Sequence, residues 1–198
     1  MKTIVIAHQK GGVGKSTLTI NIANCLSLSG SKVAVIDTDL QGTTYMTLQN
    51  ENIDLFSSIE QFQLSSTKCD YLVVDTPPFN MSNYETFFNM SDLLVIPTQL
   101  NVPDILAIEA TLQYFNNSKN ANKKAMVVLN RIKGSANYSS VIERLEQIKG
   151  AAVIGESRVV DRVSFSNSIL SDNAIFSSDD EKAKSEIESL TNEIISLL

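Results

Sequence analysis

A glycine-rich run of eight residues near the start of the chain constrains the fold most strongly. The run Lys10–Thr17 follows a short apolar stretch, Thr3–Ala7, that is rich in β-branched residues, and it precedes apolar residues at helical spacing. The first N–H groups of a helix have no partner within it, and the helix dipole adds positive potential there. A strand, a glycine-rich turn and a helix in this order therefore predict a phosphate-binding loop.

Each residue of this loop has an expected role. The glycines let the backbone curve closely around phosphate oxygens, and Lys15 is expected to contact the β- and γ-phosphates of a nucleotide. Ser16 would place its hydroxyl on Mg²⁺, and Thr17 would contact the α-phosphate. The predicted nucleotide-binding residues of the loop are Gly11, Gly12, Val13, Gly14, Lys15, Ser16 and Thr17.

The loop departs from the common pattern G-x-x-x-x-G-K-[ST]. Gln9 stands where the first glycine belongs, and a second lysine, Lys10, follows it. The resulting K-G-G-x-G-K-[ST] resembles the deviant Walker A motif of the ParA/MinD family, which includes the nitrogenase iron protein. The resemblance implies that two chains dimerise around ATP and that Lys10 of each reaches the phosphates of the other. Because such a cation neutralises transition-state charge in phosphoryl transfer, Lys10 and Lys15 are predicted to be catalytic.

Acidic residues follow two further predicted strands. Asp37 and Asp39 come at the end of the apolar run Val33–Ile36, and Asp75 ends another such run. Ligands of open α/β sheets bind at the carboxyl ends of strands, and Mg²⁺ needs few direct carboxylates because it keeps several waters. We therefore predict that Ser16, Asp37 and Asp75 hold the metal and that Asp39 is catalytic. The residues leave open which of Asp37 and Asp39 orients the attacking water.

Both acidic motifs add to the resemblance. The D-T-P-P of Asp75–Pro78 matches the family pattern, and Asp37–Gly42 matches its D-x-D-P-Q-G except that Leu40 replaces proline. We expect Leu40 to loosen this switch loop while the acids stay in place.

The predicted strand Ala125–Leu129 leads to Asn130 and Arg131, which the family also places there. An amide can both donate to and accept from an adenine edge, so Asn130 is predicted to contact the base. The resemblance implies that Arg131 also belongs to the nucleotide-binding residues. Val159, Val160 and Asp161 are expected to supply another wall of the base site.

Apolar runs alternate with helical patterns along the chain. Strands are expected at Thr3–Ala7, Val33–Ile36, Ile53–Phe56 (a short edge strand), Tyr71–Val74, Leu93–Ile96, Ala125–Leu129 and Ala152–Ile154. Four helices are expected. One covers Lys15–Leu28, a second starts near Asp104, a third ends at Gly150 and the last covers Asp180–Leu197. Uniformly apolar strands separated by helices predict a doubly wound, mostly parallel sheet with helices on both faces. We expect one α/β domain, residues 1–198.

Charge is distributed unevenly along the chain. The formal net charge is −6, yet residues 119–162 carry 9 Lys/Arg against 4 Asp/Glu. Such a segment fits either contact with DNA phosphates or an ordinary solvated surface. The resemblance favours non-specific DNA binding, for which the candidate residues are Lys133, Arg144, Lys149, Arg158 and Arg162.

Other features narrow the class of protein. The sequence contains no stretch of eighteen apolar residues, so we expect no transmembrane helix. The first predicted strand begins at Thr3, which leaves no room for the parts of a secretion signal, so we expect none. Cys25 and Cys69 have no metal or redox spacing and do not suit an iron–sulfur protein. Lys10 and the D-T-P-P turn speak against a ligase-type enzyme, and the acidic last helix speaks against a MinD-like membrane switch.

The resemblance therefore implies a Mg²⁺-dependent ATPase that forms a homodimer with ATP. Such a protein binds DNA and partitions a plasmid or chromosome, and a small centromere-binding, ParB-type partner stimulates its hydrolysis. It is expected in the cytoplasm, on the nucleoid when ATP is bound. A ParA relative that positions a protein cargo remains an open alternative, and a MinD-like membrane-associated switch is a further one.

Overall fold

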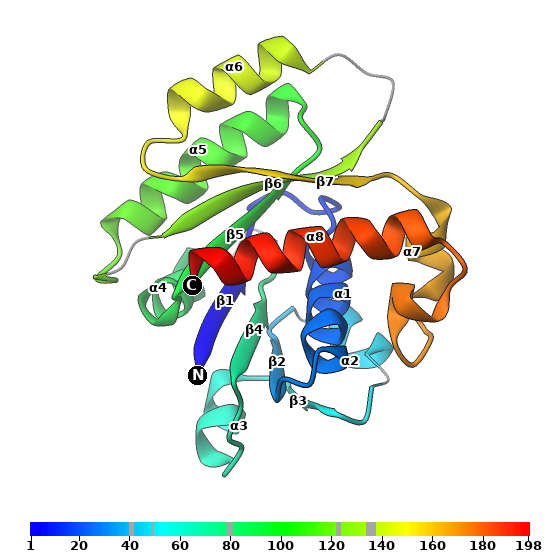
Figure 1. Cartoon of the computed structure of the whole chain (residues 1–198). Helices are drawn as coiled ribbons and strands as arrows, with labels where there is room; N and C mark the ends of the chain where they lie inside the picture. Colours follow the sequence, from blue (N-terminus) through cyan, green and yellow to red (C-terminus); the bar gives the residue numbers. More distant parts are fainter. Residues whose placement is uncertain (40–41, 49, 79–80, 122–123, 134–137) are drawn as a thin grey trace.

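The computed structural model describes residues 1–39, 42–48, 50–78, 81–121, 124–133 and 138–198. Its centre is a seven-stranded sheet in the order β3-β2-β4-β1-β5-β6-β7, in which every neighbouring pair is parallel (Figure 1). Helices cover both faces, so the predicted doubly wound α/β fold is confirmed. The strands are β1 (Lys2–Ile6), β2 (Val33–Asp37), β3 (Ile53–Phe56), β4 (Tyr71–Asp75), β5 (Leu93–Thr98), β6 (Ala125–Ile132) and β7 (Val153–Val160).

All seven expected strands are present, but β7 is longer than its apolar run. The prediction ended at Ile154, whereas the strand continues to Val160. It lies at the edge of the sheet, where exposed positions such as Glu156 and Arg158 are polar and interrupt the apolar pattern.

The long helices follow the predicted periodicity and the short ones do not. The helices are α1 (Lys15–Leu28), α2 (Thr43–Thr47), α3 (Ile59–Leu64), α4 (Met81–Met90), α5 (Val102–Asn117), α6 (Ser139–Ile148), α7 (Val163–Ser168), the 3₁₀ helix η1 (Ala174–Ser177) and α8 (Glu181–Leu197). We did not expect α2, α3, α4 or α7. Three of these have only five or six residues, too few to display a 3.6-residue period. Among the described residues, no helix has both the length and the apolar character needed to cross a membrane.

Side chains of the central strand β1 point alternately into two apolar cores, one on each face of the sheet. Ile4 and Ile6 of β1 belong to the core beneath α1 and α8, whereas Val5 belongs to the core beneath α4 and α5. This alternation follows from the two-residue period of a strand. In Figure 1 the C-terminal helix α8 crosses in front of the sheet beside α1.

The sheet order brings three strand ends together. β1 lies between β4 and β5, and in the β-sheet register Asp75 pairs with both Ile6 of β1 and Asp37 of β2. The loop after β1 therefore emerges beside the carboxylates that end β2 and β4.

The outer edge of β7 is covered by carboxylates of α8. Glu193 accepts hydrogen bonds from the N–H groups of Glu156 (2.7 Å) and Ser157 (2.9 Å), and Glu186 accepts one from Val160 (3.0 Å). An edge strand otherwise presents N–H groups that can pair with another chain. Glu186 and Glu193 of α8 thus have a structural role at the edge of the sheet.

Candidate nucleotide-binding site

The glycine-rich loop requires glycine at position 14, directly before α1. Gly14 precedes the first residue of α1 with φ 93°, and Gly12 has φ 76°, both in the left-handed region. A Cβ atom at Gly14 would lie 2.3 Å from Nδ2 of Asn130. The backbone conformation and the close approach of Asn130 therefore both exclude a side chain there.

Lys15 places a buried cation at this loop. Its side chain is buried, and its Nζ lies 3.4 Å from the carbonyl oxygen of Lys10. Burial lowers the pKa of the Lys15 ammonium, while the carboxylates of Asp75 and Asp39 oppose that change. A buried cation at the N-terminus of α1 gives the loop the electrostatics of an anion site.

Lys10 points to a different part of the chain. Its Nζ lies 2.7 Å from Oδ1 of Asp104 and 3.5 Å from Oδ1 of Asn101, both at the start of α5. The Lys10 side chain is 39% exposed, whereas that of Asp104 is fully buried. The two lysines of the loop therefore differ. Lys15 is buried, whereas Lys10 is partly exposed and contacts the start of α5 in the same chain.

Asp75 has the properties of a metal-site carboxylate. It is fully buried, and its Oδ2 accepts a 2.6 Å hydrogen bond from the hydroxyl of Thr44. Its Oδ1 has no hydrogen-bond partner among the described residues. Burial raises the pKa of Asp75 to about 6, and the nearby hydroxyls of Thr44 and Ser16 act in the opposite direction. An unsatisfied carboxylate oxygen near a serine hydroxyl fits Mg²⁺, which accepts hard oxygen ligands directly or through water.

Asp37 lies beside Asp75, but the backbone engages its oxygens. It accepts hydrogen bonds from the N–H groups of Asp39 (3.0 Å) and Tyr45 (2.8 Å), and so holds the beginning of α2. Burial raises the pKa of Asp37, and these N–H groups oppose the change. Asp39 lies half-buried after β2, near enough to Lys15 to act on its pKa. Leu40, expected to loosen this loop, lies outside the described residues.

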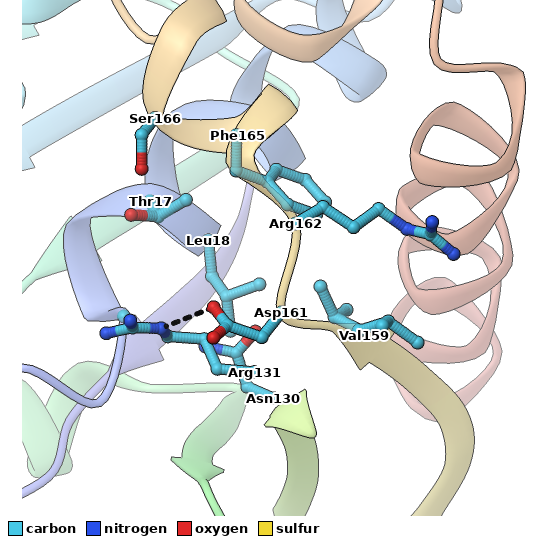
Figure 2. A pocket seen from close by; sticks show the side chains of 11 residues that line it. Thr17, Leu18, Asn130, Arg131, Val159, Asp161, Arg162, Phe165 and Ser166 are labelled. Atoms are coloured by element: carbon cyan, nitrogen blue, oxygen red, sulfur yellow. Dashed lines mark hydrogen bonds and ion pairs between the residues drawn. The ribbon is translucent and has the colours of Figure 1, made fainter. Parts of the chain in front are cut away.

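A pocket of about 130 Å³ opens beside the loop (Figure 2). It is lined by Gly14, Thr17, Leu18, Asn130, Arg131, Val159, Val160, Asp161, Arg162, Phe165 and Ser166. The structure thus brings the predicted base-site residues of β6 and β7 together next to α1. Phe165, on a helix that we did not expect, adds an aromatic ring that the sequence pattern had not indicated.

Asn130 and Arg131 also bind backbone carbonyl groups of the phosphate loop. Nδ2 of Asn130 donates to the carbonyl oxygen of Val13 (2.7 Å), and Nη1 of Arg131 donates to that of Gly12 (3.0 Å). Figure 2 shows the ion pair between Nε of Arg131 and Asp161, at 3.1 Å. Both residues therefore line the pocket and also fix the shape of the loop, while their contact with a nucleotide stays a prediction.

Sequence reasoning missed His8, the only histidine of the chain. It is fully buried, and its Nδ1 accepts a hydrogen bond from the N–H of Lys10 (3.0 Å). Burial lowers its pKa to about 4 despite the nearby Asp104 carboxylate. A single histidine after a strand carries no pattern that could have indicated this contact.

The five candidate DNA-contacting residues do not gather on one side of the sheet. Arg144 lies on α6 and Lys149 directly follows it, and this helix packs with α5 on one face. Arg162 instead pairs with Glu186 of α8, which covers the other face, at 2.6 Å. Figure 2 shows its guanidinium directed toward that helix and away from the pocket. Lys133 follows β6 and Arg158 lies on β7, and both are exposed.

The parallel sheet, the glycine-rich loop and the buried Lys15 and Asp75 define a P-loop nucleotide-binding protein. The CobQ/CobB/MinD/ParA nucleotide-binding domain family matches residues 4–175. The chain therefore belongs to this family, whose ParA and MinD members are ATPases.

Individual relatives extend the likeness over the full chain. The maintenance of carboxysome distribution protein A of Halothiobacillus neapolitanus is 25% identical over 209 residues, covering 98% of this chain and 96% of the relative. A putative plasmid partition protein of Borrelia burgdorferi, bound to AMPPNP, has a TM-score of 0.77 and 20% identity, covering 100% and 99% of the two chains. The ParA of pNOB8, bound to nonspecific DNA, has a TM-score of 0.64 and 15% identity, covering 98% and 99%. The two solved structures share the fold of this chain.

Proposed function

We propose that this chain is a Mg²⁺-dependent ATPase that dimerises when it binds ATP and then binds DNA without sequence specificity. Hydrolysis, stimulated by a small ParB-type partner, returns it to monomers that leave the DNA. Repeated cycles would partition a plasmid or chromosome within the cytoplasm, with the ATP-bound dimer on the nucleoid.

The observation that carries this proposal is the separation of the two loop lysines. Lys15 is buried in the loop, where it can contact phosphates of its own nucleotide. Lys10 is partly exposed and held by Asp104 at the start of α5. Because its side chain is 39% exposed, Lys10 can leave Asp104 and turn to the nucleotide of a second chain.

The remaining site residues have distinct roles in this cycle. Ser16 and Asp75 would hold Mg²⁺, which neutralises charge on the β- and γ-phosphates when bound. Asp39 would orient the attacking water. Asp37 was also predicted to hold the metal, but its two oxygens accept backbone N–H groups, so we assign it instead to keeping the start of α2 next to the metal site. Asn130 would keep the loop closed around the phosphates through its hydrogen bond to Val13.

A second candidate function is the positioning of a protein cargo. It is favoured by the full-length likeness to the carboxysome distribution protein of Halothiobacillus neapolitanus. A membrane-binding role for α8 is disfavoured, because Glu186 and Glu193 of that helix bind the edge of β7.

Size-exclusion chromatography and DNA co-sedimentation, each with ATP, ADP or no nucleotide, test the proposal. The wild type should dimerise with ATP alone, and that dimer should bind DNA in a manner that salt weakens. Lys10→Ala should lose the dimer or its ATP turnover. Lys2→Ala is the matched control, because Lys2 also forms a surface ion pair, with Asp92 at 3.1 Å, away from the loop.

The same assays separate the candidates. An ATP-dependent dimer without DNA affinity at low salt would contradict DNA partition and leave the ATPase assignment standing. Equal behaviour of the Lys10 and Lys2 variants would contradict the role of Lys10. Among the candidate DNA contacts, Lys133→Ala and Arg158→Ala should weaken binding more than Arg162→Ala, whose guanidinium is engaged by Glu186.

A further inference from the structure

Thr44 makes a contact with the metal-site carboxylate that the predicted motifs do not include. It is the second residue of α2 and is fully buried, and its hydroxyl donates to Oδ2 of Asp75 over 2.6 Å. A length of 2.6 Å is in the range of charge-assisted O–H···O⁻ hydrogen bonds, which are about twice as strong as neutral ones.

This hydrogen bond determines how the carboxylate of Asp75 is oriented. Oδ2 is directed to Thr44, so the other oxygen, Oδ1, must point elsewhere. Oδ1 has no hydrogen-bond partner in the part of the chain that the structure describes, although it is buried. The Ser16 hydroxyl, a predicted metal ligand, lies near enough to stabilise the charged carboxyl. The arrangement leaves Oδ1 of Asp75 as the oxygen that is available to a metal ion.

The position of the Thr44 hydroxyl is itself fixed by the sheet. The next residue, Tyr45, donates its backbone N–H to Asp37 at 2.8 Å. Asp37 and Asp75 are paired in register at the ends of β2 and β4. The first turn of α2 is thus bound to two adjacent strand ends, and this holds the hydroxyl where it can restrain Asp75.

We propose that Thr44 is a positioning residue that orients Asp75 for Mg²⁺, an inference that rests on the proposed ATPase function. Thr44 acts through Asp75 and does not contact the nucleotide. The hydroxyl is the part of the side chain that matters, because valine has nearly the same shape and cannot donate.

A fluorescent ATP analogue carrying a methylanthraniloyl group tests the inference without relying on turnover. Its binding is measured first in EDTA and then during a Mg²⁺ titration, which gives the Mg²⁺ concentration for half of the metal-dependent change. The variants are Thr44→Val, which removes the hydroxyl, and Thr44→Ser, which keeps it. Thr111→Val is the matched control, since Thr111 is a buried threonine whose hydroxyl donates to the Ala107 carbonyl oxygen at 2.7 Å in α5.

Thr44→Val should require about ten-fold more Mg²⁺ than the wild type, the effect of losing one hydrogen bond to a charged group. Thr44→Ser and Thr111→Val should stay within about two-fold of the wild type, and binding in EDTA should be equal for all four proteins. If Thr44→Val does not fold, as judged by its thermal unfolding, Thr44→Ala takes its place and is interpreted in the same way.

Three results would overturn the inference. Thr44→Val could need no more Mg²⁺ than the wild type, Thr44→Ser could be impaired as strongly as Thr44→Val, or Thr44→Val could lose binding equally in EDTA. The proposed function fails separately, since a wild type that binds the ATP analogue neither with nor without Mg²⁺ would refute the ATPase assignment itself.

Discussion

Replacing Asp75 by asparagine is expected to stabilise the nucleotide-free protein at neutral pH. Asp75 is fully buried, and one of its oxygens has no hydrogen-bond partner among the described residues. Above its pKa the folded chain must therefore hold a buried charge that the unfolded chain exposes to water. An asparagine amide carries no charge, and its oxygen can still accept the hydrogen bond from Thr44.

The size of this effect follows from the pKa values. Burial raises the pKa of Asp75 from 3.8 to about 6, so the folded state holds its proton more tightly than the unfolded state. The stability contributed by this group is complete below about pH 4 and is lost as the pH rises through about 6. About two pH units correspond to roughly 3 kcal/mol, which shifts the melting temperature of a chain of this size by roughly 6–12 °C.

Thermal unfolding followed by circular dichroism, in EDTA without nucleotide and from pH 4 to pH 8, measures this directly. The melting temperature of Asp75→Asn should exceed that of the wild type at pH 7.5, and the difference should vanish near pH 4. Asp92→Asn is the control, because Asp92 is a partly exposed carboxylate paired with Lys2 and should show no such gain. A gain that is absent at pH 7.5, or constant across the pH range, would refute the reasoning.

Three other changes test separate parts of the structure. Burial lowers the pKa of His8 to about 4, so its contribution to stability is complete above pH 6.5 and is lost as the pH falls. Between pH 7 and pH 4, the free energy of unfolding in urea should fall by about 3 kcal/mol less for His8→Asn than for the wild type. An equal fall in the two proteins would contradict this. Gly14→Ala should weaken binding of the fluorescent ATP analogue at least about ten-fold because a Cβ would meet Asn130, whereas Gly30→Ala, with φ 87° and open space around it, should bind normally. Glu193→Ala should lower the free energy of unfolding by about 2 kcal/mol, because two N–H groups of β7 lose their acceptor; an unchanged urea midpoint would show that water replaces the carboxylate.

Features that depend on neighbouring residues could be predicted from the sequence. The strand, the turn and the helix around Lys10–Thr17 are contiguous, so local spacing alone predicts the phosphate loop. Apolar runs predicted every strand for the same reason, and the order of strands and helices predicted a parallel sheet. β7 and the short helices were harder, because the polar residues of an edge strand and single turns of helix carry little periodic signal.

Contacts between distant residues could not be predicted in this way. Lys10 meets Asp104 across 94 positions and Asn130 meets Val13 across 117, and no local pattern links the members of either pair. The basic segment counted along the sequence is likewise divided by the sheet, since α6 and Arg162 lie on opposite faces.

The sequence by itself therefore determined the class of the protein, because a phosphate loop and its fold are encoded in local patterns of glycine, charge and apolar spacing. Only the tertiary structure decided how the site is held. Thr44 can restrain Asp75 only because the sheet order places β2 beside β4, and Asn130 of β6 can hold the loop after β1 only because β5 alone separates these two strands. Local spacing cannot specify such pairs, because a hydrogen bond depends on where two segments meet in space.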